Sequence, residues 1–154
     1  HTIAYYNFDD AMSSEIDSWA LDTVNRKSGK FSCKLFEGNM YNPTFRIRYD
    51  HLIPEDKDHA WLRISLWYFT KGNMEDNKTA IVVNMPHNKY NLKYREYDLK
   101  DSFKNPSGWN YMQADYMTPY PYSEKDTFGI YVWYKGKGEP VWVDDVRIEG
   151  YFVK

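Results

Sequence analysis

Nine short runs rich in aromatic and β-branched residues fill most of the chain, and helical periodicity is nearly absent. Glycine, proline, asparagine or aspartate bounds these runs, as is typical at the ends of strands. The best candidate for a helix, Asp10 to Trp19, contains Ser13 and Ser14, which favours a loop with a turn of helix. Strands are predicted over Thr2–Phe8, Lys30–Glu37, Pro43–Tyr49, His59–Phe69, Thr79–Met85, Tyr94–Leu99, Trp109–Tyr116, Asp126–Tyr134 and Val141–Tyr151.

Strands without intervening helices predict an all-β fold, either a two-sheet antiparallel sandwich or a barrel. At 154 residues, the chain has the length of one domain with a sizeable core. It contains no internal repeat, low-complexity tract or linker. We therefore predict a single β-sandwich domain over residues 1–154. Because the chain starts at His1 rather than at a methionine, we expect this domain to be part of a longer polypeptide.

Charge and composition argue against two classes of partner. The net charge of −2 and the pI near 6.1 give no electrostatic reason to expect nucleic acid or an anionic membrane surface. No apolar run approaches the roughly 18 residues of a membrane-spanning helix, so no membrane insertion is expected. Cys33 is the single cysteine, which excludes an internal disulfide, and we expect it to be a small buried core residue.

The final predicted strand, within Pro140–Glu149, carries two adjacent carboxylates between apolar residues. Strand alternation predicts Val141, Val143 and Asp145 on one face, and Trp142, Asp144, Val146 and Ile148 on the other. Both faces are then largely apolar, so at least one acid has to lie beside the core. A buried carboxylate is costly unless a cation, a metal ion or several backbone N–H donors meet it.

The other strands combine apolar inward positions with aromatic and polar outward positions. Aromatic residues make up 19% of the chain and the mean hydropathy is −0.79, which suits sheets with one buried and one wet face. The predicted inward sets are Phe45, Ile47 and Tyr49; Leu62, Ile64 and Leu66; Ile81, Val83 and Met85; and Phe128, Ile130 and Val132. The outward positions carry Trp, Tyr, Arg and Asn, whereas an ordinary solvated sheet carries Lys, Glu and Thr.

Several stretches occur in the order and spacing of a known family: Tyr6–Asp9, Lys27–Ser32, Trp61–Trp67, Trp109, Phe128–Trp133 and Val141–Val146. In these stretches the chain resembles the jelly-roll carbohydrate-binding modules of the galactose-binding-domain type. Such modules are appended to polysaccharide hydrolases and to bacterial surface proteins. The resemblance implies a jelly-roll sandwich that acts as a non-catalytic accessory domain with an extracellular, cell-surface or periplasmic location.

The resemblance also implies a structural Ca²⁺ where the first strand, the Ser-Gly turn and the last strand meet. The implied ligands are Asp9, Asp144 or Asp145 through carboxylates, and Asn7, Ser28 and Lys30 through backbone carbonyls. Ca²⁺ takes six to eight hard oxygen ligands, including carbonyls of this kind. The family usually has glutamate at the position of Asp9. The alternative is that the Asp144–Asp145 pair accepts N–H donors from the N-terminal segment, or pairs with Arg26 or Lys30.

In the topology that the resemblance implies, the third, fifth, sixth and eighth predicted strands form a concave sheet. That sheet would bind a glycan with Arg46, Arg48, Val82, Asn84, Tyr94, Tyr131 and Trp133. Sugar sites combine an aromatic plate with forked donors and carboxamides. A single exposed aromatic is more commonly structural cover, so the prediction depends on the whole co-facing set. Trp61, Arg63 and Trp67 are expected on the opposite sheet.

Catalytic motifs are missing from the sequence, so the domain is not expected to be an enzyme. His51, His59 and His87 lack metal-ligand spacing, and there is no nucleophile elbow or phosphate-binding glycine loop. The expected partners are a poly- or oligosaccharide and other domains of the parent chain. The alternative function is a structural or protein-interaction jelly-roll domain of a larger bacterial surface protein, without sugar affinity.

Overall fold

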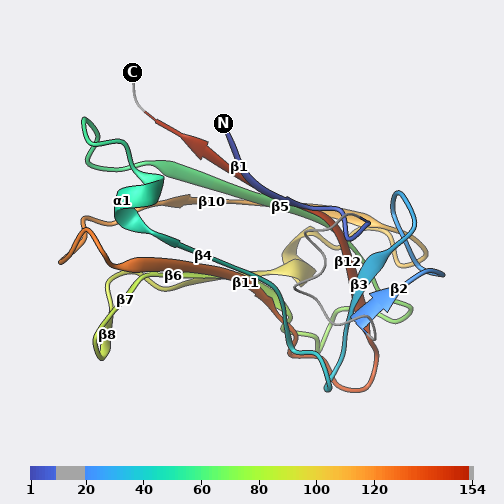
Figure 1. Ribbon diagram of the computed structural model, residues 1–154. Coiled ribbons are helices and arrows are strands. Elements are labelled where there is room, and N and C mark those ends of the chain that lie inside the picture. The colour runs from blue at the N-terminus through green and yellow to red at the C-terminus, as the bar shows by residue number, and fades with distance from the viewer. Residues whose placement is uncertain (10–19, 153–154) are drawn as a thin grey trace.

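The computed structural model describes residues 1–9 and 20–152, and these form an antiparallel β-sandwich (Figure 1). All nine predicted strands are present, with ends that differ by a few residues. The predicted loop over Asp10–Trp19 lies outside the described residues. The strands are β1 (Thr2–Tyr6), β2 (Leu21–Asp22), β3 (Ser32–Leu35), β4 (Tyr41–Arg48), β5 (Trp61–Phe69), β6 (Ala80–Asn84), β7 (Pro86–His87), β8 (Tyr90–Asn91), β9 (Arg95–Asp98), β10 (Asn110–Met117), β11 (Thr127–Trp133) and β12 (Val141–Tyr151).

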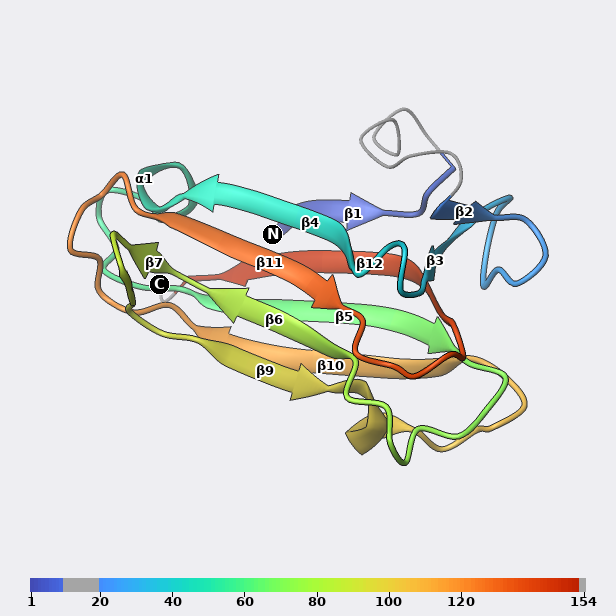
Figure 2. The ribbon, with the colours of Figure 1, turned by 90° about the horizontal axis from the view of Figure 1, so that it is seen from below.

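Two sheets face each other across the core. One has the order β10-β5-β12-β3-β2, with β1 pairing on β12, and the other has the order β4-β11-β6-β9. Figure 2 shows the four-stranded sheet in front of the six-stranded sheet. A short helix, α1 (Tyr49–Leu52), follows β4, and a 3-10 helix, η3 (Leu99–Ser102), follows β9. No helix in the described ranges is long and apolar enough to cross a membrane.

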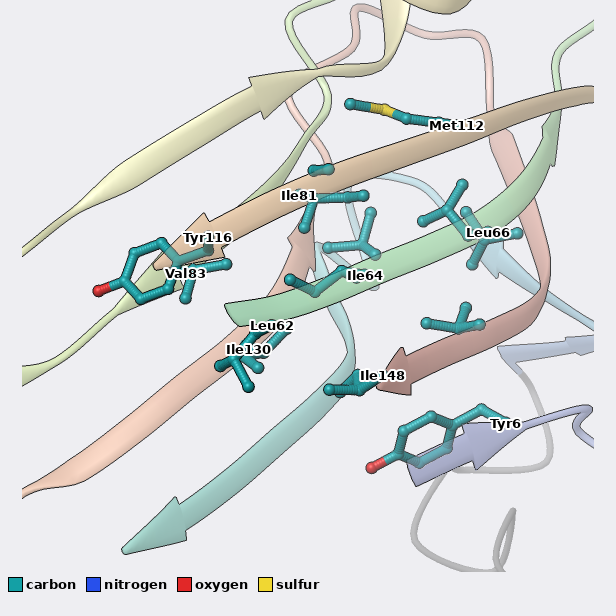
Figure 3. Packing of buried hydrophobic residues seen from close by; sticks show 14 of the residues in the cluster. Tyr6, Leu62, Ile64, Leu66, Ile81, Val83, Met112, Tyr116, Ile130 and Ile148 are labelled. Carbon is teal, nitrogen blue, oxygen red and sulfur yellow. The ribbon is translucent and has the colours of Figure 1, made fainter. Parts of the chain in front are cut away.

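The core consists of the apolar side chains that both sheets direct inward (Figure 3). Leu62, Ile64 and Leu66 of β5 are at most 1% exposed, as their alternation predicts. They pack with inward residues of β6 and β11, among them Ile81 and Ile130. Cys33 is also fully buried, as expected. The alternation of side chains between the two faces of a strand therefore predicts the core correctly wherever a strand is regular.

The alternation predicted for the last strand is wrong beyond Val143, because β12 contains a β-bulge. Its pairing with β5 shifts between Asp144 and Arg147, and Asp145 adopts a positive φ of 49°. The extra residue changes the phase of the strand. Val141, Val143, Val146 and Ile148 consequently all belong to the same core cluster. Asp144 is nevertheless fully buried, as the apolar surroundings of the acid pair predict.

Strand β4 differs from its predicted range at both ends. It begins at Tyr41 rather than at Pro43, and Tyr49 already starts α1. Tyr49 remains buried and stacks on Phe128 at 6.1 Å between ring centroids. Proline within a strand is compatible with an edge position, and β4 is an edge strand of its sheet.

Removing core volume between the sheets should lower stability. We expect Ile64→Ala to reduce the free energy of unfolding by about 2 to 5 kcal/mol, because it deletes buried methyl groups and leaves a cavity. Val24→Ala, at a side chain that is 82% exposed, is the control and should change little. Urea unfolding measures both variants, and equal effects would contradict the position of the core.

Candidate functional site

The first and last strands meet around a short turn, and we call this junction the strand clasp. It consists of the carboxylates of Asp9, Asp144 and Asp145 with the segment 27–31. The buried Asp144 accepts hydrogen bonds at Oδ2 from the backbone N–H of Lys27 at 2.9 Å and of Ser28 at 3.2 Å. Its Oδ1 accepts the N–H of Asp145 at 2.8 Å. Burial raises the pKa of Asp144 to about 6, although these three N–H donors act to lower it.

The other two carboxylates of the strand clasp hold the same turn. Asp145 accepts the Ser28 hydroxyl at 2.9 Å and the Tyr5 hydroxyl at 2.7 Å. Asp9 accepts the backbone N–H of Lys30 at 2.9 Å and of Phe31 at 2.7 Å. The structure therefore brings the predicted residues of this junction together, and backbone donors of the N-terminal segment meet the buried acid.

The donor set of the strand clasp is the kind that Ca²⁺ uses, but its carboxylates already accept hydrogen bonds. Asn7, another implied ligand, accepts the N–H of Asp9 through its side-chain Oδ1 at 3.0 Å. Within the described ranges, no three His, Cys, Asp or Glu side chains gather as potential metal ligands. In this arrangement the three carboxylates act as hydrogen-bond acceptors for the turn. Calcium here stays a prediction.

The strand clasp depends on a glycine in the turn. Gly29 has a φ of 58°, and a Cβ there would collide with the Asp9 carboxylate. We expect Gly29→Ala to displace Asp9 and to destabilise the fold. Gly138→Ala is a matched control, because Gly138 also has a positive φ of 91° but no atom lies within 4 Å of its added Cβ.

Thermal or urea unfolding compares the two glycine variants. Gly29→Ala should lower the free energy of unfolding by at least about 1 kcal/mol more than Gly138→Ala does. The difference corresponds to the hydrogen bonds that Asp9 would lose from the N–H groups of Lys30 and Phe31. Equal destabilisation would mean that the Asp9 contact contributes nothing beyond backbone strain.

The second candidate site lies on the outer face of the four-stranded sheet, which we call the aromatic face. Its strands, β4, β11, β6 and β9, are the four that were predicted to lie in one sheet. The register places Trp133 opposite Tyr41, and Gly129 opposite both Arg46 and Asn84. The predicted residues of three strands are thus brought together on one surface.

Three aromatic side chains form a cluster on the aromatic face. Tyr41 stacks on Trp133 with ring centroids 5.9 Å apart, and it meets Tyr131 edge-on at 6.1 Å. The Lys135 ammonium lies 4.5 Å from the centre of the Trp133 ring. Tyr41 is 51% exposed, whereas Tyr131 and Trp133 are half-buried. Tyr41, which the sequence prediction missed, therefore offers the most open aromatic surface of the cluster.

Paired polar groups lie at both edges of the sheet. At the end of β4, away from the cluster, Arg48 forms an ion pair with Asp50 of α1. Near β9, Tyr94 donates to Glu96 Oε1 at 2.6 Å, and Lys135 donates to Glu96 Oε2 at 2.9 Å. Tyr94 itself precedes β9, which begins at Arg95. The sequence prediction included Arg48 and Tyr94 but missed Glu96 and Lys135.

The centre of the aromatic face is filled by its own side chains. Val82 points outward, as predicted, but it is fully buried, so it contributes to the packed floor and offers no open contact surface. The indole Nε1 of Trp133 is also buried and has no hydrogen-bond partner in the described residues. A buried donor without an acceptor is uncommon in native structures.

The opposite sheet carries the other predicted aromatics. Trp61, Met117 and Tyr151 lie side by side on β5, β10 and β12 and are 42% to 46% exposed. Trp67 packs against Tyr111 at 5.3 Å. These residues lie on the outer face of the six-stranded sheet, as the sequence predicted for Trp61 and Trp67.

In sequence, the chain matches no protein-family model and no curated protein. Solved structures share its fold. The CBM22-1 xylan-binding domain of Paenibacillus barcinonensis Xyn10C aligns at 9% identity over 100% of this chain and 97% of that one, with a TM-score of 0.59. The C-terminal family 22 carbohydrate-binding module of Clostridium thermocellum Xyn10B aligns at 10% identity over 83% and 77% of the two chains, with a TM-score of 0.51.

These similarities confirm the predicted fold class: the chain has the jelly-roll β-sandwich fold of carbohydrate-binding modules. The Stig cyclase Fisc of Fischerella sp. TAU also shares the fold, at 12% identity over 88% of this chain and 71% of that one, with a TM-score of 0.50. Function therefore has to be argued from the site rather than from the fold.

Proposed function

We propose that the domain is a non-catalytic carbohydrate-binding module that binds a glycan on its aromatic face. The observation that carries this proposal is the cluster of Tyr41, Tyr131 and Trp133 beside Arg46 and Asn84. A pyranose ring offers an apolar C–H face that stacks on an aromatic ring, and its hydroxyls accept and donate hydrogen bonds around that face. Arginine and asparagine supply the polar groups that such hydroxyls need.

The unpaired Trp133 Nε1 supports a ligand at this cluster. Leaving such a donor buried without an acceptor costs about 1 to 3 kcal/mol. The neighbouring Tyr41 is 51% exposed, so its ring has room to move aside. A sugar hydroxyl that reached Nε1 after such a movement would supply the missing acceptor.

The polar contacts on the aromatic face favour binding over catalysis. A glycosidase needs two carboxyl groups about 5 to 10 Å apart, with one of them able to act as an acid. By register, Glu96 and Asp98 of β9 are the acids beside the aromatic cluster, and Tyr94 and Lys135 both bind Glu96. These partners lower the pKa of Glu96, which opposes a role as a proton donor at neutral pH.

The proposal places the domain in a longer polypeptide outside the cytoplasm, at the cell surface or in the periplasm, where polysaccharides are found. An alternative is a protein-interaction domain without sugar affinity. The observation in its favour is the exposed row of Trp61, Met117 and Tyr151 on the opposite sheet, because contiguous exposed apolar side chains often mark interfaces.

Glycan binding should depend on Tyr41. We expect the domain to be retained in affinity gels that contain its polysaccharide, and Tyr41→Ala to weaken binding by about tenfold, because aromatic contacts of this kind contribute roughly 1 to 1.5 kcal/mol. Trp61→Ala is the control, since it removes an equally exposed aromatic from the opposite sheet.

A panel of plant, algal and bacterial polysaccharides tests these variants, with circular dichroism to check folding. Loss of binding in Trp61→Ala but not in Tyr41→Ala would move the site to the other sheet. No retention on any member of the panel would count against a glycan ligand altogether.

Structural Ca²⁺ at the strand clasp is a separate part of the proposal. It is supported by the resemblance and by the hard oxygen donors of Asp9, Asp144 and Asp145 around one turn. Bound calcium would replace N–H donors as the partner of these carboxylates and should raise the melting temperature. We expect EDTA to lower the midpoint and added Ca²⁺ to restore it.

Asp144→Asn controls the calcium experiment, because an amide weakens a metal site but keeps one acceptor oxygen for the turn. The variant should lose the response to EDTA. An unchanged midpoint in the unaltered protein, with no metal in elemental analysis, would instead mean that hydrogen bonds alone hold the strand clasp.

A further inference from the structure

Arg46 differs from the other cations around the aromatic face in having no protein partner. Arg48 is paired with Asp50, and Lys135 is paired with Glu96. Arg46 is exposed, and it makes no hydrogen bond or ion pair to any residue of the described ranges. Because Arg46 has no ion-pair partner among these residues, its guanidinium is available to a ligand.

We propose that the glycan bound on the aromatic face is anionic, and that Arg46 binds a carboxylate or a sulfate ester on one of its sugars. This inference rests on the proposed glycan-binding function and narrows its ligand class. A guanidinium presents two parallel N–H donors that match the paired oxygens of a carboxylate or sulfate. A neutral hydroxyl can accept a hydrogen bond from Arg46, but it provides no negative charge to pair with the guanidinium.

The absence of a side chain at Gly129 brings Asn84 and Arg46 close together. Gly129 lies opposite both residues in the sheet. A Cβ on Gly129 would lie 2.5 Å from Asn84 Oδ1 and 3.9 Å from Arg46 Nη1. Asn84 directs its carbonyl oxygen over Gly129, so this atom can accept a hydrogen bond from a sugar hydroxyl, whereas Arg46 is the donor for the anionic group.

The spacing along β11 places this position next to the sugar-stacking cluster. Gly129 and Tyr131 are two residues apart on the same face, which is about 7 Å along a strand. Arg46 also acts to lower the pKa of Tyr131, as expected for a nearby cation, although burial raises that pKa overall. An acidic sugar substituent would therefore reach Arg46 from a ring stacked on or beside the cluster.

Open space continues on the outer side of Arg46. β4 is the edge strand of the sheet, and a hollow of about 440 Å³ lies between it and the N-terminal segment. Thr44 and Arg46 line this hollow on one side and residues 3–6 on the other. Arg46 thus belongs both to the aromatic face and to the wall of this hollow, so a charged substituent can approach it from the open edge of the sheet.

The inference is tested with pairs of polysaccharides that differ only in charge. Suitable pairs are homogalacturonan and its methyl ester, glucuronoxylan and its carboxyl-reduced form, and chondroitin sulfate and its desulfated form. The carboxylate and sulfate pairs distinguish the two sources of negative charge. Titration calorimetry or affinity electrophoresis should give tighter binding to the anionic member of at least one pair, and higher ionic strength should reduce that preference.

Arg46→Gln should weaken binding of the anionic member by about tenfold or more and remove the preference for it over the neutral member, since hydrogen bonds to charged groups are the stronger class. Arg46→Lys keeps the positive charge but loses the two parallel N–H donors. Its affinity for the anionic member should therefore lie between those of the unaltered protein and Arg46→Gln. Arg147→Gln, the same change at an exposed arginine of the opposite sheet, is the matched control and should have no effect.

The outcomes separate this inference from the function on which it rests. Equal binding of neutral and anionic members would overturn the inference and leave the glycan-binding proposal standing. A preference for the anionic member that survives Arg46→Gln would overturn the role of Arg46. Failure to bind any glycan, charged or neutral, would overturn both proposals.

Discussion

Burial of the Asp144 carboxylate is the constraint around which the two ends of the chain are arranged. β12 lies inside its sheet, with β5 on one side and β3 and β1 on the other. An acid there requires donors, and the backbone N–H groups of Lys27 and Ser28 supply them. The segment that leads into β3 is therefore fixed against β12. Asp9, just after β1, is fixed to the same segment through Lys30 and Phe31.

The bulge at Asp145 makes this arrangement compatible with a continuous core. In a regular strand, the acid pair would move Val146 and Ile148 to the opposite face from Val141 and Val143. The extra residue restores the phase, so both halves of β12 direct apolar side chains inward. Aspartate tolerates the left-handed conformation that the bulge needs better than a β-branched residue does. One short segment thus serves both the polar strand clasp and the apolar core.

The sequence allowed a good prediction of the strands, their division between two sheets and the inward residues of regular strands. It could not locate features that depend on irregular backbone or on distant partners. The prediction missed the bulge because strict alternation assumes that no extra residue is inserted in the strand. Tyr41 was missed because Pro43 looked like the start of a strand, although edge strands accept proline. Glu96 and Lys135 became visible only through their contact with each other, which joins β9 to the turn after β11.

Both outer faces carry exposed aromatic side chains, and the pairing of their cations distinguishes them. On the six-stranded sheet, Arg63 is held by Asp115 through two hydrogen bonds and lies over the Tyr151 ring. Arg147 and Lys27 likewise lie over the rings of Tyr5 and Trp67. The cations and many ring faces of that sheet are thus already engaged with one another. On the aromatic face, Tyr41 keeps an open ring and Arg46 keeps an unpaired charge. We therefore infer that a ligand binds on the four-stranded sheet, where the Tyr41 ring and the Arg46 guanidinium are both free to contact it.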